Sequence, residues 1–199
     1  MHFLTVASPF EYEPERIKNS RFLAVLAPVS SAAEAEAFLA AQRALHSGAN
    51  HTCYAWRLGL DGDQHRSSDD GEPSGSAGRP ILAQIEGHEL TNIVAAVTRW
   101  FGGTKLGVGG LMRAYGGAAG QAMDRAPIVQ REITTDLELR FPYDCTAVVQ
   151  ACLHAAGLEP IDSDYGSEVR LVLRVPVAQE PVLRMELSER TAGRIQLES

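Results

Sequence analysis

The first half of the chain alternates between short apolar runs and segments with helical spacing. Four such runs predict strands, at residues 2–7, 20–29, 52–60 and 91–101. Apolar residues at helical spacing predict three helices, at residues 31–45, 78–87 and 110–125. Two polar, Gly-rich stretches predict loops, at residues 61–79 and 102–109. Ser30 or Ser31 can cap the first helix, because Glu34 stands where the acid of a capping box belongs.

The second half has a regular order of short elements. They are strand 133–140, helix 143–156, strands 159–164 and 168–175, helix 177–188 and strand 193–198. This β-α-β-β-α-β order is typical of a ferredoxin-like sheet with both helices on one face. Pro142 and Pro176 precede the two helices, at positions where a helix tolerates proline. We expect this half to be a small α+β module without chemistry of its own.

The boundary between the halves lies within residues 127–134, where Pro127 ends a Gly/Ala-rich segment. We therefore expect two α+β domains, at residues 1–130 and 131–199. The charge changes at the same place. Residues 1–131 hold 13 acids and 12 bases, whereas residues 132–199 hold 12 acids and 6 bases.

The composition is that of an ordinary globular protein. Apolar residues make up 45% of the 199 residues and charged residues 22%, so a sizeable core can form and disorder is excluded. No apolar run is long enough for a bilayer, and the N-terminus lacks the basic region of a secretory signal. Three cysteines without a CxxC pair predict reduced thiols and a cytoplasmic protein, with no membrane partner.

The net charge of −7 argues against a general nucleic-acid binder. Residues 91–131 nevertheless form a basic region with a single acid, Asp124. Its five bases are Arg99, Lys105, Arg113, Arg125 and Arg131. A phosphate-binding surface is therefore expected here, if anywhere.

A loop with three carboxylates precedes the second helix. Asp69, Asp70 and Glu72 can supply the oxygen ligands of a divalent cation, but the spacing of a Ca²⁺ loop is absent. Acids on a Gly/Ser loop are more often solvated turn formers, so we expect no metal. The run Ser74–Gly78 can either expose N–H groups to an anion at the helix start or form a plain capped loop.

A second motif, residues 99–115, is rich in glycine and basic residues. Glycines ahead of a helix can form a backbone cradle for phosphate, with cations as counter-charges. The spacing is neither that of a Walker A loop nor that of a dinucleotide fingerprint. The candidate anion-binding residues are Arg79, Arg99, Gly102, Gly103, Lys105, Gly109, Gly110 and Arg113.

Catalytic constellations are not evident. Cys53 lies near His51 without a visible base and orienting partner, and Cys145 and Cys152 have the spacing of a buried helix face. The histidines lack zinc-ligand spacing. Five aromatic residues can stack on bases or belong to the core, namely Tyr54, Trp56, Trp100, Phe101 and Tyr115.

The two motifs, SSDDGEPSGSAGRPIL at 67–82 and RWFGGTKLGVGGLMRAY at 99–115, resemble those of the YigZ/IMPACT family. The sequence Asn-Ser-Arg-Phe at 19–22 is similar to the family's Lys-Ser-Arg-Phe, and the likeness spans about residues 15–125. Ser76 and Trp100 stand where the family has Thr and Tyr. The motif loop shared with the family comprises Asp69, Asp70, Gly71, Glu72, Ser74 and Gly75.

The resemblance implies a first domain similar to the fourth domain of elongation factor G, of the split β-α-β type. It implies a second domain similar to that factor's ferredoxin-like fifth domain. It also implies a cytoplasmic protein linked to translation control, and nucleic-acid binding has been proposed for bacterial members.

Three classes of function follow, and we expect a protein that is not an enzyme rather than one that is. The first is a translation-associated factor that binds RNA or the ribosome through residues 99–113. The second is an enzyme or binding protein for a phosphorylated small molecule, and the third is a protein-interaction module without nucleic acid. We expect no cofactor. The sequence does not decide the oligomeric state.

Both motifs are Gly-rich and charged, and neither follows a simple amphipathic pattern. We therefore expect the 68–80 loop and the 99–113 segment to lie side by side, with acids of the first pairing with bases of the second.

Overall fold

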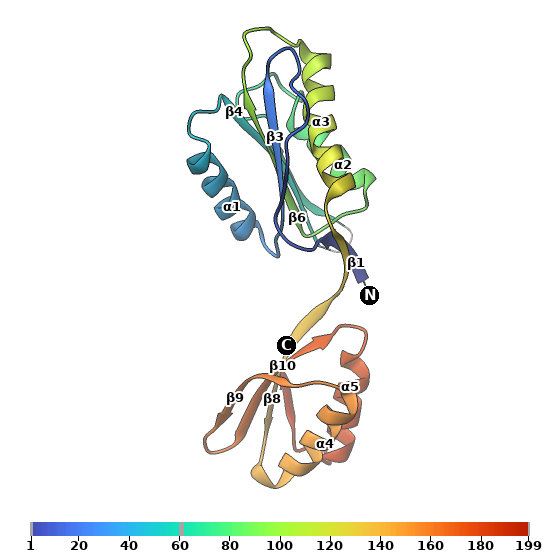
Figure 1. Cartoon of the computed structure of the whole chain (residues 1–199). Helices are drawn as coiled ribbons and strands as arrows, with labels where there is room; N and C mark the ends of the chain where they lie inside the picture. Colours follow the sequence, from blue (N-terminus) through green and yellow to red (C-terminus); the bar gives the residue numbers. More distant parts are fainter. Residues whose placement is uncertain (1, 60–61, 199) are drawn as a thin grey trace. The chain divides into compact units, whose positions relative to one another are not determined.

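The computed structural model describes residues 2–59 and 62–198 (Figure 1). The chain forms two compact units, a larger one at Phe3–Arg131 and a smaller one that begins at Glu132. Both units combine helices and strands, which confirms a two-domain α+β protein. Within the described residues, no helix has both the length and the apolar character needed to cross a bilayer.

A five-stranded antiparallel sheet forms the centre of the larger unit. Its strand order is β2 (Phe10–Tyr12), β3 (Arg21–Pro28), β6 (Ile93–Trp100), β4 (His51–Leu58) and β5 (Gln64–Ser68). Helix α1 (Ala32–Leu45) connects β3 to β4, and both strands run antiparallel to β6, which lies between them. This is the split β-α-β arrangement. β1 (His2–Val6) and β7 (Ile128–Glu132) form a separate two-stranded sheet.

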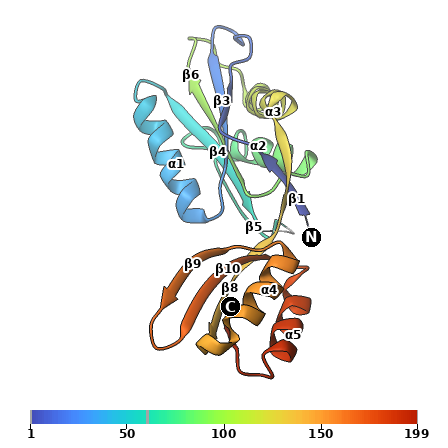
Figure 2. The same cartoon turned by 60° about the horizontal axis from the view of Figure 1, so that its bottom comes forward.

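Helices cover both faces of this sheet. α2 (Gly78–Gly87) and α3 (Val108–Arg125) lie on one face and α1 on the other, as both views show (Figures 1 and 2). Successive strand residues point to opposite faces, so Cys53 packs under α2 and α3 while Tyr54 packs under α1. This burial on both faces explains why apolar residues make up most of β3, β4 and β6.

The expected elements of this unit are present, with differences at the loops. The predicted loop 61–79 contains the strand β5, because a polar edge strand needs only backbone pairing with β4 and no apolar side chains. β2 and β7 were also not expected. The last residue of the predicted strand 52–60 and the first of the predicted loop lie outside the described residues.

The smaller unit has the predicted ferredoxin-like order. Its elements are β8 (Thr134–Phe141), a 3₁₀ turn (Tyr143–Cys145), α4 (Thr146–Ala156), β9 (Pro160–Tyr165), β10 (Val169–Pro176), α5 (Glu180–Arg190) and β11 (Gln196–Glu198). The sheet order is β11-β8-β10-β9, and both helices pack on one face. Pro176 ends a strand rather than starting α5, which begins at Glu180 with Pro181 in its first turn.

The other face of this smaller sheet carries paired charges. Arg174 of β10 pairs with Asp136 of β8 at 2.9 Å, and Arg170 pairs with Glu138 at 2.8 Å. The open face is therefore largely self-neutralised. Consistent with this pairing, the pKa values of Asp136 and Glu138 lie below the ordinary range, lowered by hydrogen bonds from Arg174 and Arg170.

Gly102, just after β6, packs directly on the Ile17–Ser20 turn. A Cβ at this position would lie 2.1 Å from the carbonyl carbon of Asn19 and 2.3 Å from the nitrogen of Ser20. We expect Gly102→Ala to lower the free energy of unfolding by about 1–3 kcal/mol, because backbone atoms must move. Gly87→Ala is the matched control. A Cβ at Gly87 meets nothing within 4 Å, so we expect a gain of about 0.4–1 kcal/mol. Urea unfolding measures both, and equal effects would contradict the close approach.

Candidate functional site

The site is built on the centre of the larger sheet. His51 at the start of β4 lies opposite Arg99 at the end of β6, and Phe22 of β3 flanks Arg99 on the other side. Cys53 follows His51 by two residues and therefore points to the same face. The pair was noted from sequence only as neighbours on a strand, and their spacing of two residues is the signal that places both side chains on one face.

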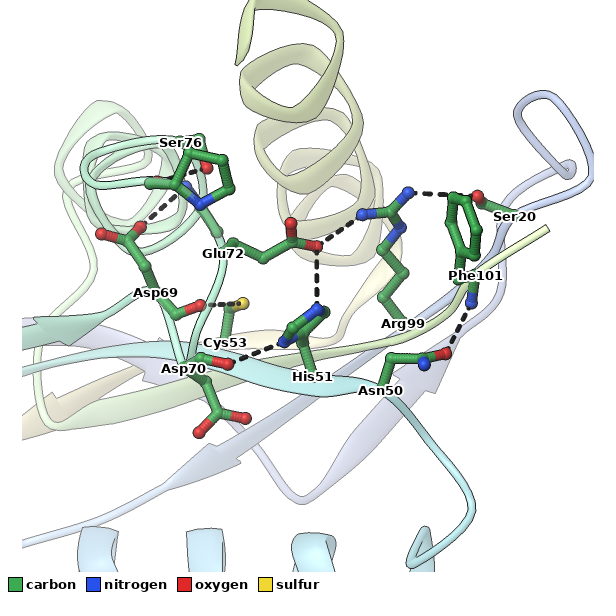
Figure 3. A network of polar contacts seen from close by, with 12 residues as sticks. Ser20, Asn50, His51, Cys53, Asp69, Asp70, Glu72, Ser76, Arg99 and Phe101 are labelled. Atoms are coloured by element: carbon green, nitrogen blue, oxygen red, sulfur yellow. Dashed lines mark hydrogen bonds and ion pairs between the residues drawn. The ribbon is translucent and has the colours of Figure 1, made fainter. Parts of the chain in front are cut away.

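Glu72 connects the motif loop to this sheet (Figure 3). Its Oε1 accepts hydrogen bonds from Arg99 Nη1 at 2.6 Å and from the Tyr115 hydroxyl at 2.7 Å. Only 5% of the Glu72 side chain and 6% of the Arg99 side chain are exposed. The pair is thus a buried ion pair, in which each charge compensates the other in a medium of low dielectric constant.

These contacts bring the two sequence motifs together as expected, through Glu72 of one and Arg99 and Tyr115 of the other. They also correct the position of Arg99, which the sequence assigns to an exposed basic surface. Arg99 is buried, its Nη2 donates to Ser20 Oγ at 3.3 Å, and Glu72 neutralises its charge. Arg99 therefore holds the loop on the sheet instead of facing solvent.

The polar groups around this pair are held in protonated forms. Burial and the nearby carboxylates, first that of Glu72, raise the pKa of the Cys53 thiol to about 12. Burial and the neighbouring Cys53 and Glu72 likewise raise the pKa of the Tyr115 hydroxyl. At neutral pH Cys53 is a thiol, donating to the Asp69 carbonyl at 3.0 Å, and not the thiolate of a nucleophilic cysteine. His51 Nδ1 donates to the Asp70 carbonyl at 2.8 Å and is oriented by it.

Asp69 occupies the N-terminus of α2. Its carboxylate accepts hydrogen bonds from the backbone N–H groups of Gly75 at 2.7 Å, Ala77 at 2.9 Å and Gly78 at 2.8 Å. Burial acts to raise the pKa of Asp69, but these three bonds outweigh it and hold the pKa below its ordinary value. The expectation that Ser74–Gly78 could receive an outside anion is corrected, because an internal carboxylate already occupies that position.

Asp70 has a third, separate role. It adopts a left-handed backbone with φ of 43°, its Oδ2 accepts from the Thr52 N–H at 2.7 Å, and Arg43 lies 3.6 Å from its Oδ1. The three acids of the loop therefore point to different partners. Among the described residues, no group of three or more His, Cys, Asp or Glu side chains could hold a metal ion.

The glycines of the second motif have different tasks. Gly102 packs against the Ile17–Ser20 turn, so its role is close packing rather than the anion cradle proposed from sequence. Gly103 and Gly107 have φ values of +86° and +72°, and an added Cβ at either position would meet no atom within 4 Å. Glycine is therefore favoured there by the left-handed backbone that turns the chain, and not by close packing. Gly107 is the N-cap of α3. The helix begins two residues earlier than predicted, and Gly109 and Gly110 belong to its first turn.

This first turn of α3 lacks the compensation that α2 receives. Among the described residues no side chain caps it, and the turn itself contains no acidic residue. Exposed Lys105 precedes it and exposed Arg113 follows it, while exposed Arg79 shares with Arg113 a groove of about 560 Å³ between α2 and α3. None of these three cations forms an ion pair with a residue that the structure describes. We call Arg79, Lys105 and Arg113 the exposed cations.

Comparison with known proteins places the chain among relatives along most of its length. Residues 18–123 match the Impact N-terminal domain, and residues 139–194 match a domain of unknown function, DUF1949. The chain is 38% identical to the IMPACT family member YigZ of Escherichia coli, covering 92% of this chain and 91% of that protein. It is 44% identical to the IMPACT family member in pol 5'region of Thermus thermophilus, covering 92% and 99%.

A solved structure extends this likeness to the fold. The crystal structure of a hypothetical protein, 36% identical in sequence, superposes with a TM-score of 0.78 and covers 100% of this chain and 97% of that chain. Together these matches confirm the family resemblance that the two motifs indicate.

The buried pair yields a stability prediction. Glu72→Gln leaves Arg99 buried without a counter-charge, and we expect it to lower the free energy of unfolding by about 3–5 kcal/mol. The matched control is Glu36→Gln, which removes one partner of the Glu36–Arg66 pair, whose side chains are 43% and 60% exposed. Because water already screens this pair, we expect a loss below about 1 kcal/mol. Urea unfolding at pH 7 distinguishes them, and a small effect of Glu72→Gln would contradict the role assigned to the buried pair.

Asp69 yields a pH prediction. Its folded pKa lies below the ordinary value of 3.8, so its stabilising effect is complete above that value and is lost as the pH falls through the folded pKa. Asp69→Asn removes the charge, and we expect a loss of about 1.5–3 kcal/mol at pH 7. The difference between the parent protein and the variant should shrink below about pH 4. Urea unfolding across pH 3–7 measures it, and a constant difference would contradict the capping role.

Proposed function

Because the chain belongs to the IMPACT family, we propose that it is a regulatory protein of translation that binds RNA phosphates, in free RNA or in the ribosome. Family membership supports a regulatory role of the YigZ/IMPACT type. Translation and RNA are the finer parts of the proposal. The binding surface we propose is the first turn of α3 together with the exposed cations.

The uncapped first turn of α3 is the observation that carries the proposal. The N–H groups at a helix start carry partial positive charge and favour anions. α2 satisfies this preference internally with Asp69, whereas no side chain in the described part of the chain caps α3, and its first turn holds no acid. Lys105 and Arg113 add full positive charges on either side of it. Phosphate oxygens are the complementary partners for such a surface.

The charge of the whole chain is compatible with this surface. Net charge is −7, and most of the excess acid belongs to residues 132–199. Several of those acids are paired with arginines, among them Asp136 with Arg174 and Glu138 with Arg170. The exposed cations all lie in the larger unit. A polyanion can therefore approach a locally basic surface on a protein that is acidic overall.

We infer a cytoplasmic location from the cysteines. Cys53, Cys145 and Cys152 are all free and buried. Unpaired cysteines are typical of a reducing compartment, which is where translation takes place.

The exposed cations yield a binding prediction. We expect Lys105→Ala and Arg113→Ala each to weaken RNA binding, and to reduce the slope of log affinity against log salt by about 0.7 to 0.9 per lost phosphate contact. Fluorescence anisotropy with labelled RNA between 50 and 200 mM salt, roughly the range over which such contacts show, measures both quantities. Arg66→Ala, which removes an exposed arginine from β5, is the control with equal charge loss.

Two results would contradict the proposal. One is the absence of RNA and ribosome binding by the parent protein at low salt. The other is a lower melting temperature of the Lys105 and Arg113 variants with unchanged affinity per folded molecule. Either result would favour a phosphorylated small-molecule ligand or a protein partner instead.

A further inference from the structure

Among the five aromatic residues that are candidates for stacking on bases, Phe101 is the one whose ring lies exposed in solvent. Tyr54, Trp56 and Tyr115 are buried in the core, with at most 8% of each exposed. Trp100 is covered by the guanidinium of Arg21, 4.3 Å from its ring centroid. Phe101 follows β6 directly, yet it is 46% exposed. A large apolar ring that remains in water has no role in the core.

The backbone on both sides of Phe101 is fixed. Its N–H donates to Asn50 Oδ1 at 2.8 Å, and the N–H of Gly102 donates to Ser20 Oγ at 3.2 Å. The Arg99 guanidinium lies 5.4 Å from the Phe101 ring centroid, a cation–π contact. Figure 3 shows the two residues next to each other, close to Glu72. The ring is thus presented by a rigid support, which lowers the entropy lost when a ligand stacks on it.

A cavity of about 340 Å³ begins at this ring. Its apolar walls are Phe101, Leu106, Val108 and Leu111. Its polar walls are Lys105, Glu72 and Arg99, and the buried Arg99 Nε has no hydrogen-bond partner among the described residues. Val108 is 52% exposed, so a second apolar surface of the cavity also faces solvent. The cavity therefore combines an aromatic face, apolar walls, a buried donor and an exposed cation.

We propose that this cavity, here called the Phe101 pocket, receives one unpaired base of a single-stranded RNA segment. The base stacks on Phe101, and Lys105 contacts an adjacent phosphate. The inference rests on the proposed function and adds which form of RNA is bound. A flat aromatic base fits a pocket with one aromatic and several aliphatic walls, and stacking accepts any base because every base has a π face. In a duplex the base faces are already stacked, so a duplex offers its phosphates and 2′-hydroxyls to this surface but no free base face.

The test compares three ligands by fluorescence anisotropy and competition. They are a labelled 12-nucleotide uridine-rich RNA strand, a blunt RNA duplex of the same length, and inorganic polyphosphate as a competitor without bases. We expect Phe101→Ala to weaken single-strand binding by about tenfold or more, since stacking on aromatic side chains contributes strongly to such affinities. Duplex and polyphosphate binding should not change. The salt slope should also stay the same, because no charge is removed.

Two further variants separate stacking from folding. Phe101→Trp keeps an aromatic face and should restore single-strand affinity, with quenching of the added indole fluorescence by the stacked base. Leu45→Ala removes an exposed apolar side chain from α1, on the opposite face of the sheet, and should leave all three ligands unaffected. Phe101 is exposed, so its variants should keep the parent melting temperature.

The outcomes distinguish this inference from the proposed function. If Lys105→Ala weakens RNA binding while Phe101→Ala does not, the Phe101 pocket is overturned and the phosphate surface stands. Equal weakening of single-strand, duplex and polyphosphate binding by Phe101→Ala would also overturn it. If the parent protein binds none of the three ligands, the Phe101 pocket is overturned, and the proposed function fails as well if the protein also does not bind ribosomes at low salt.

Discussion

The buried ion pair between Glu72 and Arg99 is the interaction on which the site depends. It joins a loop to the central sheet of the larger unit, where both side chains are almost completely buried. Because Glu72 is held, the preceding residues are held as well, and Asp69 reaches the first N–H groups of α2. Because Arg99 is held, the chain leaves β6 in a fixed direction, with Phe101 exposed and Gly102 against the Ile17–Ser20 turn.

This arrangement divides the charges of the two motifs into internal and external sets. The acids of the loop satisfy Arg99, the start of α2 and the N–H of Thr52, so they do not remain as a free acidic surface. Lys105 and Arg113 remain without ion pairs among the described residues, next to a helix start that no described side chain caps. A net acidic protein can thus present a locally basic surface, because its acids are used inside the fold and in the second unit.

Much of the fold could be predicted from the sequence, because it rests on burial. The apolar run of β6 indicated a strand, and the order of elements in the second half indicated a sheet with both helices on one face. β5 could not be predicted, because its pairing involves backbone groups that leave no trace in side-chain pattern. The site was predicted in outline only. Glu72 and Asp69 look alike in sequence, and tertiary pairing alone decides that one meets Arg99 and the other caps α2.

Crosslinking in cells tests the central claim most directly, namely that RNA contacts the exposed end of the second motif. Ultraviolet light forms covalent bonds between RNA and the side chains that the RNA contacts. Trypsin cleaves after Arg99 and after Lys105, so it would release residues 100–105 as one peptide. The account predicts RNA-modified peptides within residues 100–113, with Phe101 as the principal crosslinked residue. Recovery of the full-length protein without crosslinked RNA, or with crosslinks confined to residues 132–199, would contradict it.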